Sequence, residues 1–164
     1  MSKISVFLIV FLVFSGCNSR VEETSETSES VTGTDVQEFP EVARIDAGAR
    51  EILDAWAEYR SLEDRMAVLR EAENEEEMKL LLEELNQICT QLEESTFPVT
   101  FEQPSVQSRL KVIRTYLGKL EAALYYRLDH DEPLRELMES YNALREQFNV
   151  IVRNTLSPDL FEDE

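Results

Sequence analysis

The stretch that decides the fold is residues 132–156, EPLRELMESYNALREQFNVIVRNTL, in which core-type side chains recur at alternating steps of three and four. The pattern runs through Leu134, Leu137, Tyr141, Leu144, Phe148, Ile151 and Thr155. These steps place one narrow stripe on one face of a helix, as in helices that pack side by side. The stretch therefore predicts an amphipathic helix that ends before Ser157-Pro158.

Three further stretches repeat this pattern and predict helices at about 41–72, 75–95 and 104–129. Pro40 and Pro104 suit the starts of two of them, because proline is favoured in the first helical turn. The chain has only 4 glycines and 5 prolines, which disfavours a turn-rich β fold. We therefore expect an all-α fold, an up-down-up-down four-helix bundle with coiled-coil-like heptads over residues 41–156.

A single long helix over residues 41–95 is the alternative to two helices in the first half. Asn74 followed by Glu77 forms a capping-box-like pattern, and the apolar register shifts by one residue there. Both features favour a helix–turn–helix. No glycine or proline marks the turn, so a continuous or kinked helix stays open at this point.

Charge is distributed unevenly along the chain, whose formal net charge is −18. Residues 75–95 carry a net −6 and residues 105–130 a net +3, so these two helices are expected to be neighbours. The acidic total argues against nucleic acid as a partner, because phosphate binding needs clustered basic side chains. It also disfavours docking on anionic lipid through a basic patch.

The first seventeen residues, MSKISVFLIVFLVFSGC, have the layout of a signal peptide. The apolar run at 4–14 would span about 16 Å as a helix, which is too short for a bilayer core of about 30 Å. A single basic residue, Lys3, precedes the run, as in an export signal.

The end of this signal, Phe14-Ser15-Gly16-Cys17, resembles the lipobox of bacterial lipoproteins, with Phe14 at a position where leucine is usual. The resemblance implies that Cys17 becomes the N-terminus and carries acyl chains such as palmitate, which hold the protein on a membrane. It implies a place in the bacterial cell envelope, periplasmic or surface-facing. Asn18 instead of aspartate favours the outer over the inner membrane. The rest of the chain faintly resembles small uncharacterised helical lipoproteins of Bacteroidota, which implies no defined activity.

Residues 18–40, NSRVEETSETSESVTGTDVQEFP, are rich in Ser, Thr and Glu and carry a net −5. Such a composition predicts a disordered tether that holds the bundle away from the lipid. Residues 157–164 are expected to form an acidic C-terminal tail.

A short segment between the second and third predicted helices, residues 97–104, has the sequence FPVTFEQP. Phe97, Val99 and Phe101 alternate along it, which indicates an extended segment with one apolar edge. Two interpretations follow: a lid packed on the bundle, or an exposed patch that binds a partner.

The sequence lacks the motifs of the common catalytic and metal sites. It has one histidine, His130, no Glu-x-x-His pair and no glycine-rich phosphate loop. Once Cys17 is set apart, Cys89 is the remaining cysteine and is expected to be a buried apolar residue. We therefore predict no catalytic residue, no metal, no cofactor and no enzyme. Weak cation binding at the acidic residues 71–77 is a minor alternative.

These observations lead to the expectation of a membrane-anchored, non-catalytic helical module that binds or scaffolds an unknown protein partner. A homodimer is one alternative, because Leu80, Leu81 and Leu82 widen the apolar stripe of the second helix. A small-ligand or metal-binding periplasmic bundle, with a cavity lined by aromatic side chains, is another. The third is a chaperone-like holdase that uses residues 97–101.

Overall fold

The computed structural model describes residues 40–155, and the statements below concern that part of the chain. The predicted signal peptide, the tether up to residue 39 and the acidic tail lie outside it. The described part contains five α-helices and no strand: α2 (Ala47–Asp54), α3 (Ala57–Arg70), α4 (Glu75–Glu94), α5 (Pro104–Tyr126) and α6 (Asp131–Thr155). A 3₁₀ helix, η2 (Val99–Phe101), lies between α4 and α5. The all-α prediction is confirmed.

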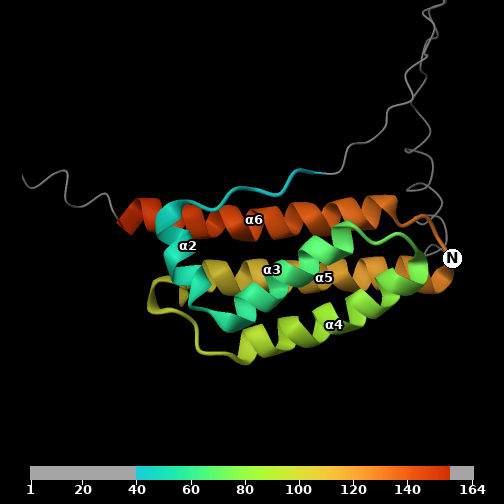
Figure 1. Ribbon diagram of the computed structural model, residues 1–164, viewed down its shortest axis with the longest axis horizontal. Helices are drawn as coiled ribbons and strands as arrows, with labels where there is room; N and C mark the ends of the chain where they lie inside the picture. The colour runs from blue at the N-terminus through green and yellow to red at the C-terminus, as the bar shows by residue number, and fades with distance from the viewer. Residues whose placement is uncertain (1–39, 156–164) are drawn as a thin grey trace, which may run out of the picture. The chain divides into compact units, whose positions relative to one another are not determined.

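The helices form a bundle in which α6 and α4 lie on opposite sides, with α3 and α5 between them (Figure 1). Helix α4 packs against both α3 and α5, and α5 packs along α6. The expected neighbours of opposite charge, α4 and α5, are thus in contact. The stripe quoted above faces the core, where Leu137, Leu144 and Phe148 are fully buried. No helix of the described residues is both long and apolar enough to cross a membrane.

The turn between α3 and α4 has the helix cap that the sequence favours. The Asn74 side-chain oxygen accepts a hydrogen bond from the Glu77 N–H at 2.9 Å. The Glu77 carboxylate in turn accepts one from the Glu73 N–H at 3.2 Å. These bonds satisfy N–H groups at a helix start that lack partners within the helix. The single continuous helix over residues 41–95 is therefore wrong.

The prediction of one helix over 41–72 is also wrong, because its first part is extended. Residues 41–46, which we call the strap, run along α6 (Figure 1). Asn142 accepts from the Ala43 N–H and donates to the Glu41 carbonyl, at 2.8 and 2.7 Å. Asn149 accepts from the Asp46 N–H at 2.8 Å. Because side chains of α6 satisfy the backbone of the strap, the segment does not need helical hydrogen bonds.

A second break separates α2 from α3 at Ala55 and Trp56. The Trp56 N–H turns back to the Leu53 carbonyl at 3.0 Å, and its backbone then becomes extended. The indole N–H donates to the Ser95 hydroxyl at 3.0 Å, across the bundle from the start of α3. The break thus brings the indole into the core, where it is almost fully buried.

Candidate functional site

The residues singled out from the sequence are placed as follows. Phe14, Ser15, Gly16 and Cys17 lie outside the described residues, so the lipidation site stays a prediction. Phe101 is fully buried, with its ring centroid 4.6 Å from that of Phe148. Phe97 is half-buried, and its ring lies 4.8 Å from Trp56. Val99 is 90% exposed.

The predicted partner patch is therefore not one exposed surface. The Phe101 N–H bonds to the Pro98 carbonyl at 2.7 Å, which closes the turn of η2 and directs the Phe101 ring inward. For Phe101, the structure agrees with the interpretation of a lid packed on the bundle, because its side chain belongs to the core. Val99 alone stands out into solvent, and Phe97 keeps one edge accessible.

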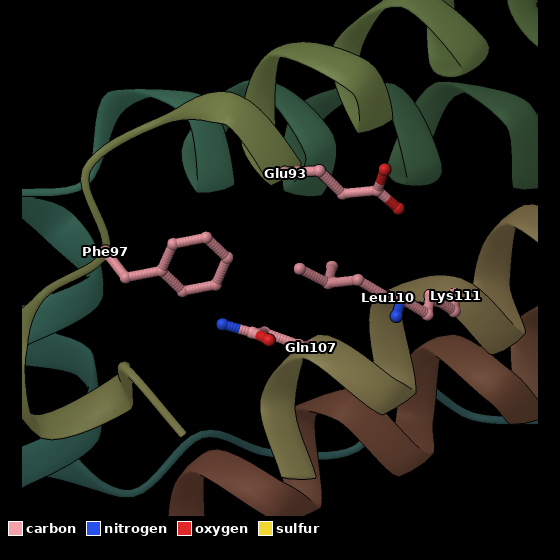
Figure 2. A pocket seen from close by; sticks show the side chains of 5 residues that line it. All are labelled: Glu93, Phe97, Gln107, Leu110 and Lys111. Atoms are coloured by element: carbon pink, nitrogen blue, oxygen red, sulfur yellow. The ribbon is translucent and has the colours of Figure 1, made fainter. Parts of the chain in front are cut away.

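That edge of Phe97 belongs to a small pocket between the end of α4 and the start of α5. The pocket encloses about 200 Å³. Figure 2 shows its lining: Glu93 from α4, Phe97 from the connecting segment, and Gln107, Leu110 and Lys111 from α5. The Phe97 ring and the Leu110 side chain both point into the space. Here helix and loop bring together two apolar walls and three polar side chains.

Glu93 has one satisfied and one unsatisfied carboxylate oxygen. Its Oε2 accepts from Arg114 Nη1 at 2.9 Å, which ties α4 to α5. Its Oε1 is buried and has no hydrogen-bond partner among the described residues. A buried oxygen left without a partner costs about 1–3 kcal/mol. The oxygen is covered by its neighbours and does not open onto the pocket.

The other two polar side chains of the pocket are hydrogen-bond donors without partners. Within residues 40–155, neither the Lys111 ammonium nor the Gln107 amide takes part in a side-chain hydrogen bond or an ion pair. Both residues are exposed, so water reaches them. The pocket therefore offers two solvated donors beside an apolar surface, and the free oxygen of Glu93 lies behind its wall.

A part-buried charged cluster lies elsewhere, where α2, α3 and α6 meet. Glu63 accepts from both nitrogens of Arg50 at 2.7 and 2.8 Å, and from Arg145 at 2.5 Å. The hydrogen bonds from Arg50 lower the pKa of Glu63, and that carboxylate raises the pKa of Arg50. Burial raises the pKa of Tyr141, whose hydroxyl accepts from Arg145 at 3.0 Å. Each of these shifts favours the charge state that the group already has at neutral pH, so the cluster serves the fold.

Cys89 is buried on α4, as expected. Burial, and next the negative charge of Glu93, raise the pKa of its thiol to about 12. The thiol is therefore protonated and unreactive at neutral pH. The described residues contain no group of three or more His, Cys, Asp or Glu side chains that could hold a metal ion. This statement includes the acidic residues 71–77.

No family model, no curated protein and no solved structure matches this chain.

Of the pocket residues, only Phe97 was singled out from the sequence. Glu93, Gln107 and Lys111 read as ordinary surface positions of two amphipathic helices. Residues 107, 110 and 111 share one face of α5 by their spacing, whereas residue 97 lies beyond the end of α4 and no helical spacing joins it to residue 93. Only the register between α4 and α5, which is a tertiary property, shows that the two sets face one another.

Proposed function

We propose that this protein is a lipid-anchored, non-catalytic binding or scaffolding module of the bacterial cell envelope. Cys17 carries the lipid, residues 18–40 are the spacer, and the outer membrane is the favoured location. The support for the anchor is the apolar run at 4–14 followed by Ser15-Gly16-Cys17. For the bundle we propose the simple topology of four long helices that alternate in direction, with α2 as a short addition.

The observation that carries the proposal is the attachment of the strap to α6. The chain enters the described bundle at Glu41, whose carbonyl is held by Asn142 in the middle of α6. Arg145 then bonds to the Ala43 carbonyl at 2.6 Å, and Asn149 to the Arg44 carbonyl at 2.8 Å. Several hydrogen bonds therefore share the load when the preceding spacer is pulled. Such an attachment suits a domain that works while held to a surface by its N-terminal side.

Metabolic labelling with an alkyne analogue of palmitate tests the anchor. We expect wild type and Cys89→Ala to incorporate the label and to sediment with membranes. Cys17→Ala is expected to lose both properties. Cys89→Ala is the matched control because it removes the other cysteine of the chain. Equal labelling of Cys17→Ala and wild type would contradict the proposal.

The partner is a protein of unknown identity, and self-association is the first case to test. Leu80 on α4 is 63% exposed, although it lies beside the buried Leu81 and Leu82. Light scattering after size exclusion measures the mass directly. We expect Leu80→Gln to shift a dimer toward monomer, and a strict monomer in wild type would remove the homodimer.

Two other functions differ in their support. A holdase that captures clients through Phe97 and Phe101 requires Phe101 to reach them, and its ring is fully buried. A small-ligand function has the pocket of about 200 Å³ beside Phe97 in its favour.

A further inference from the structure

Three large apolar side chains stand out into solvent where α5 ends and the turn to α6 begins. Tyr125, Tyr126 and Leu128 are 78%, 68% and 61% exposed. The two tyrosine rings meet edge to face, with their centroids 5.0 Å apart. We call residues 125–128 the aromatic tip. Exposed apolar side chains that are grouped in this way mark a surface that binds a partner or a membrane.

The strap leads toward the same end of the bundle. The Ala43 N–H is held by Asn142, and the Asp46 N–H, further along the strap, is held by Asn149, further along α6. The strap therefore runs parallel to α6. Followed backwards, it points to the start of α6 at Asp131, which the aromatic tip directly precedes (Figure 1). About 16 Å of helix separates Asn142 from that start, a distance that about five extended residues cover.

The length of the spacer suits a membrane at this end. Residues 18–40 are 23 residues, and a flexible chain of that length has an end-to-end distance of about 24–29 Å. This distance exceeds the 16 Å between the strap and the start of α6, so the tip reaches the lipid surface without a stretched spacer. Val99 lies at the other end of the bundle, because it precedes α5 and the helix spans about 34 Å before it ends at Tyr126.

The charges around the tip indicate which kind of lipid surface it fits. Arg127 is exposed within the tip, and a guanidinium suits the phosphate of a lipid headgroup. Asp129, Asp131 and Glu132 follow directly and are also exposed, so a surface with net negative charge would repel them. Tyrosine favours the boundary between headgroups and acyl chains, because its ring is apolar and its hydroxyl stays in water. Together these side chains fit a zwitterionic phospholipid surface.

We propose that the aromatic tip inserts into the zwitterionic headgroup region of the membrane that holds the protein, an inference that rests on the lipid anchor proposed above. Tyr125, Tyr126 and Leu128 supply the apolar contact, and Arg127 binds headgroup phosphate. The lipid on Cys17 and the tip then form two contacts with one surface. Two contacts fix the orientation of the bundle, which stands on its α5–α6 turn with Val99 directed away from the membrane.

The test uses the full chain, purified from membranes and reconstituted into phosphatidylcholine vesicles. A second set of vesicles carries bromine on the acyl chains, which quenches a tryptophan that touches them. Tyr126→Trp places a reporter in the tip, and Val99→Trp is the matched control, because Val99 is 90% exposed at the opposite end. Trp56, the sole tryptophan of the natural chain, is buried, so wild type gives the background.

We expect brominated lipid to quench Tyr126→Trp at least about threefold more than Val99→Trp, because an interfacial ring lies against the acyl chains. Adding Tyr125→Ser and Leu128→Ser to Tyr126→Trp should remove most of this quenching, since the remaining apolar contact is small. Anionic phosphatidylglycerol in the vesicles should weaken it, because the acids after the tip are repelled. All three substituted side chains are exposed, and circular dichroism checks that the helices are intact.

The outcomes separate the tip from the anchor. Vesicles that carry the protein but leave Tyr126→Trp unquenched would overturn the tip contact and leave the anchor standing. Equal quenching of Tyr126→Trp and Val99→Trp would show that the bundle has no fixed orientation, which also overturns the inference. Loss of both sedimentation with vesicles and quenching would overturn the anchor together with the tip. A concentration-dependent blue shift of Tyr126→Trp without vesicles would make a second copy of the chain the occupant of the tip.

Discussion

Asn149→Ala is expected to release one end of the strap from α6. The Asn149 side chain is buried, and it accepts from the Asp46 N–H and donates to the Arg44 carbonyl, both at 2.8 Å. A net hydrogen bond contributes about 0.5–1.5 kcal/mol, so two bonds contribute about 1–3 kcal/mol. The further bond to Glu146 involves an exposed carboxylate and adds little.

The cost stays within that range because the released backbone groups reach water. The strap lies at the N-terminal side of the described bundle, so it can detach without exposing the deep core around Phe148. We therefore expect a fall of about 2 kcal/mol in the free energy of unfolding, not the collapse of the bundle.

Urea unfolding measures the total loss, and amide hydrogen exchange locates it. The Asp46 N–H should lose protection in Asn149→Ala, while the Ala43 N–H, held by Asn142, should keep more of it. Asn154→Ala is the matched control, because Asn154 is exposed on the same helix. A loss no larger than that of the control, with the Asp46 amide still protected, would refute the role given to Asn149.

Three further predictions concern other sites. Gly118→Ala should raise the free energy of unfolding measured in urea by up to about 1 kcal/mol, because the new Cβ meets nothing within 4 Å. In Gly48→Ala the new Cβ would lie 3.0 Å from Val152 Cγ1, so this substitution should stabilise the protein less or destabilise it. Arg127 closes α5 in the left-handed region at φ 54°, so Arg127→Gly should raise the melting temperature, and an unchanged or lower value would show that no strain is stored there. Because the folded pKa of Cys89, about 12, lies above its ordinary value of 9.0, its protonated thiol stabilises the fold below pH 9, and roughly 2–3 kcal/mol should be lost by pH 11. Cys89→Ala should flatten the dependence of stability on pH above 9, and an equal slope in both proteins would contradict this.

The helices that the sequence predicts best are those whose determinants are local. The predicted 75–95 and 132–156 agree with α4 and α6 within one residue at each end, and 104–129 starts where α5 does. Asn74 as a cap, Pro104 in a first turn and the alternating apolar steps all act within a few residues of where they stand. Helix α5 ends earlier than expected because Arg127 turns into the left-handed region, which nothing local demands of an arginine.

The failure over residues 41–72 has a different origin. Ile45 and Ala49 are buried as a helical stripe requires, yet Ile45 reaches the core from an extended backbone. An apolar residue every three or four positions does not distinguish a helix from an extended segment when another helix, here α6, supplies hydrogen bonds to the backbone of that segment. The deciding groups are polar side chains on α6, about a hundred residues away in the chain. The pocket escapes prediction for a similar reason, because Glu93 and Lys111 face one space only through the register of α4 and α5.

The polar side chains of α6 also explain why the strap has one register. Asn142 and Asn149 are seven residues apart, which corresponds to about 10.5 Å along a helix. The backbone N–H groups that they bind, of Ala43 and Asp46, are three residues apart, which corresponds to about 10 Å along an extended chain. A slip of the strap by one residue would move its N–H groups by about 3.4 Å and turn Ile45 away from the core. The spacing of two amide side chains on the helix therefore specifies both the extended conformation of the strap and the point at which the chain joins the bundle.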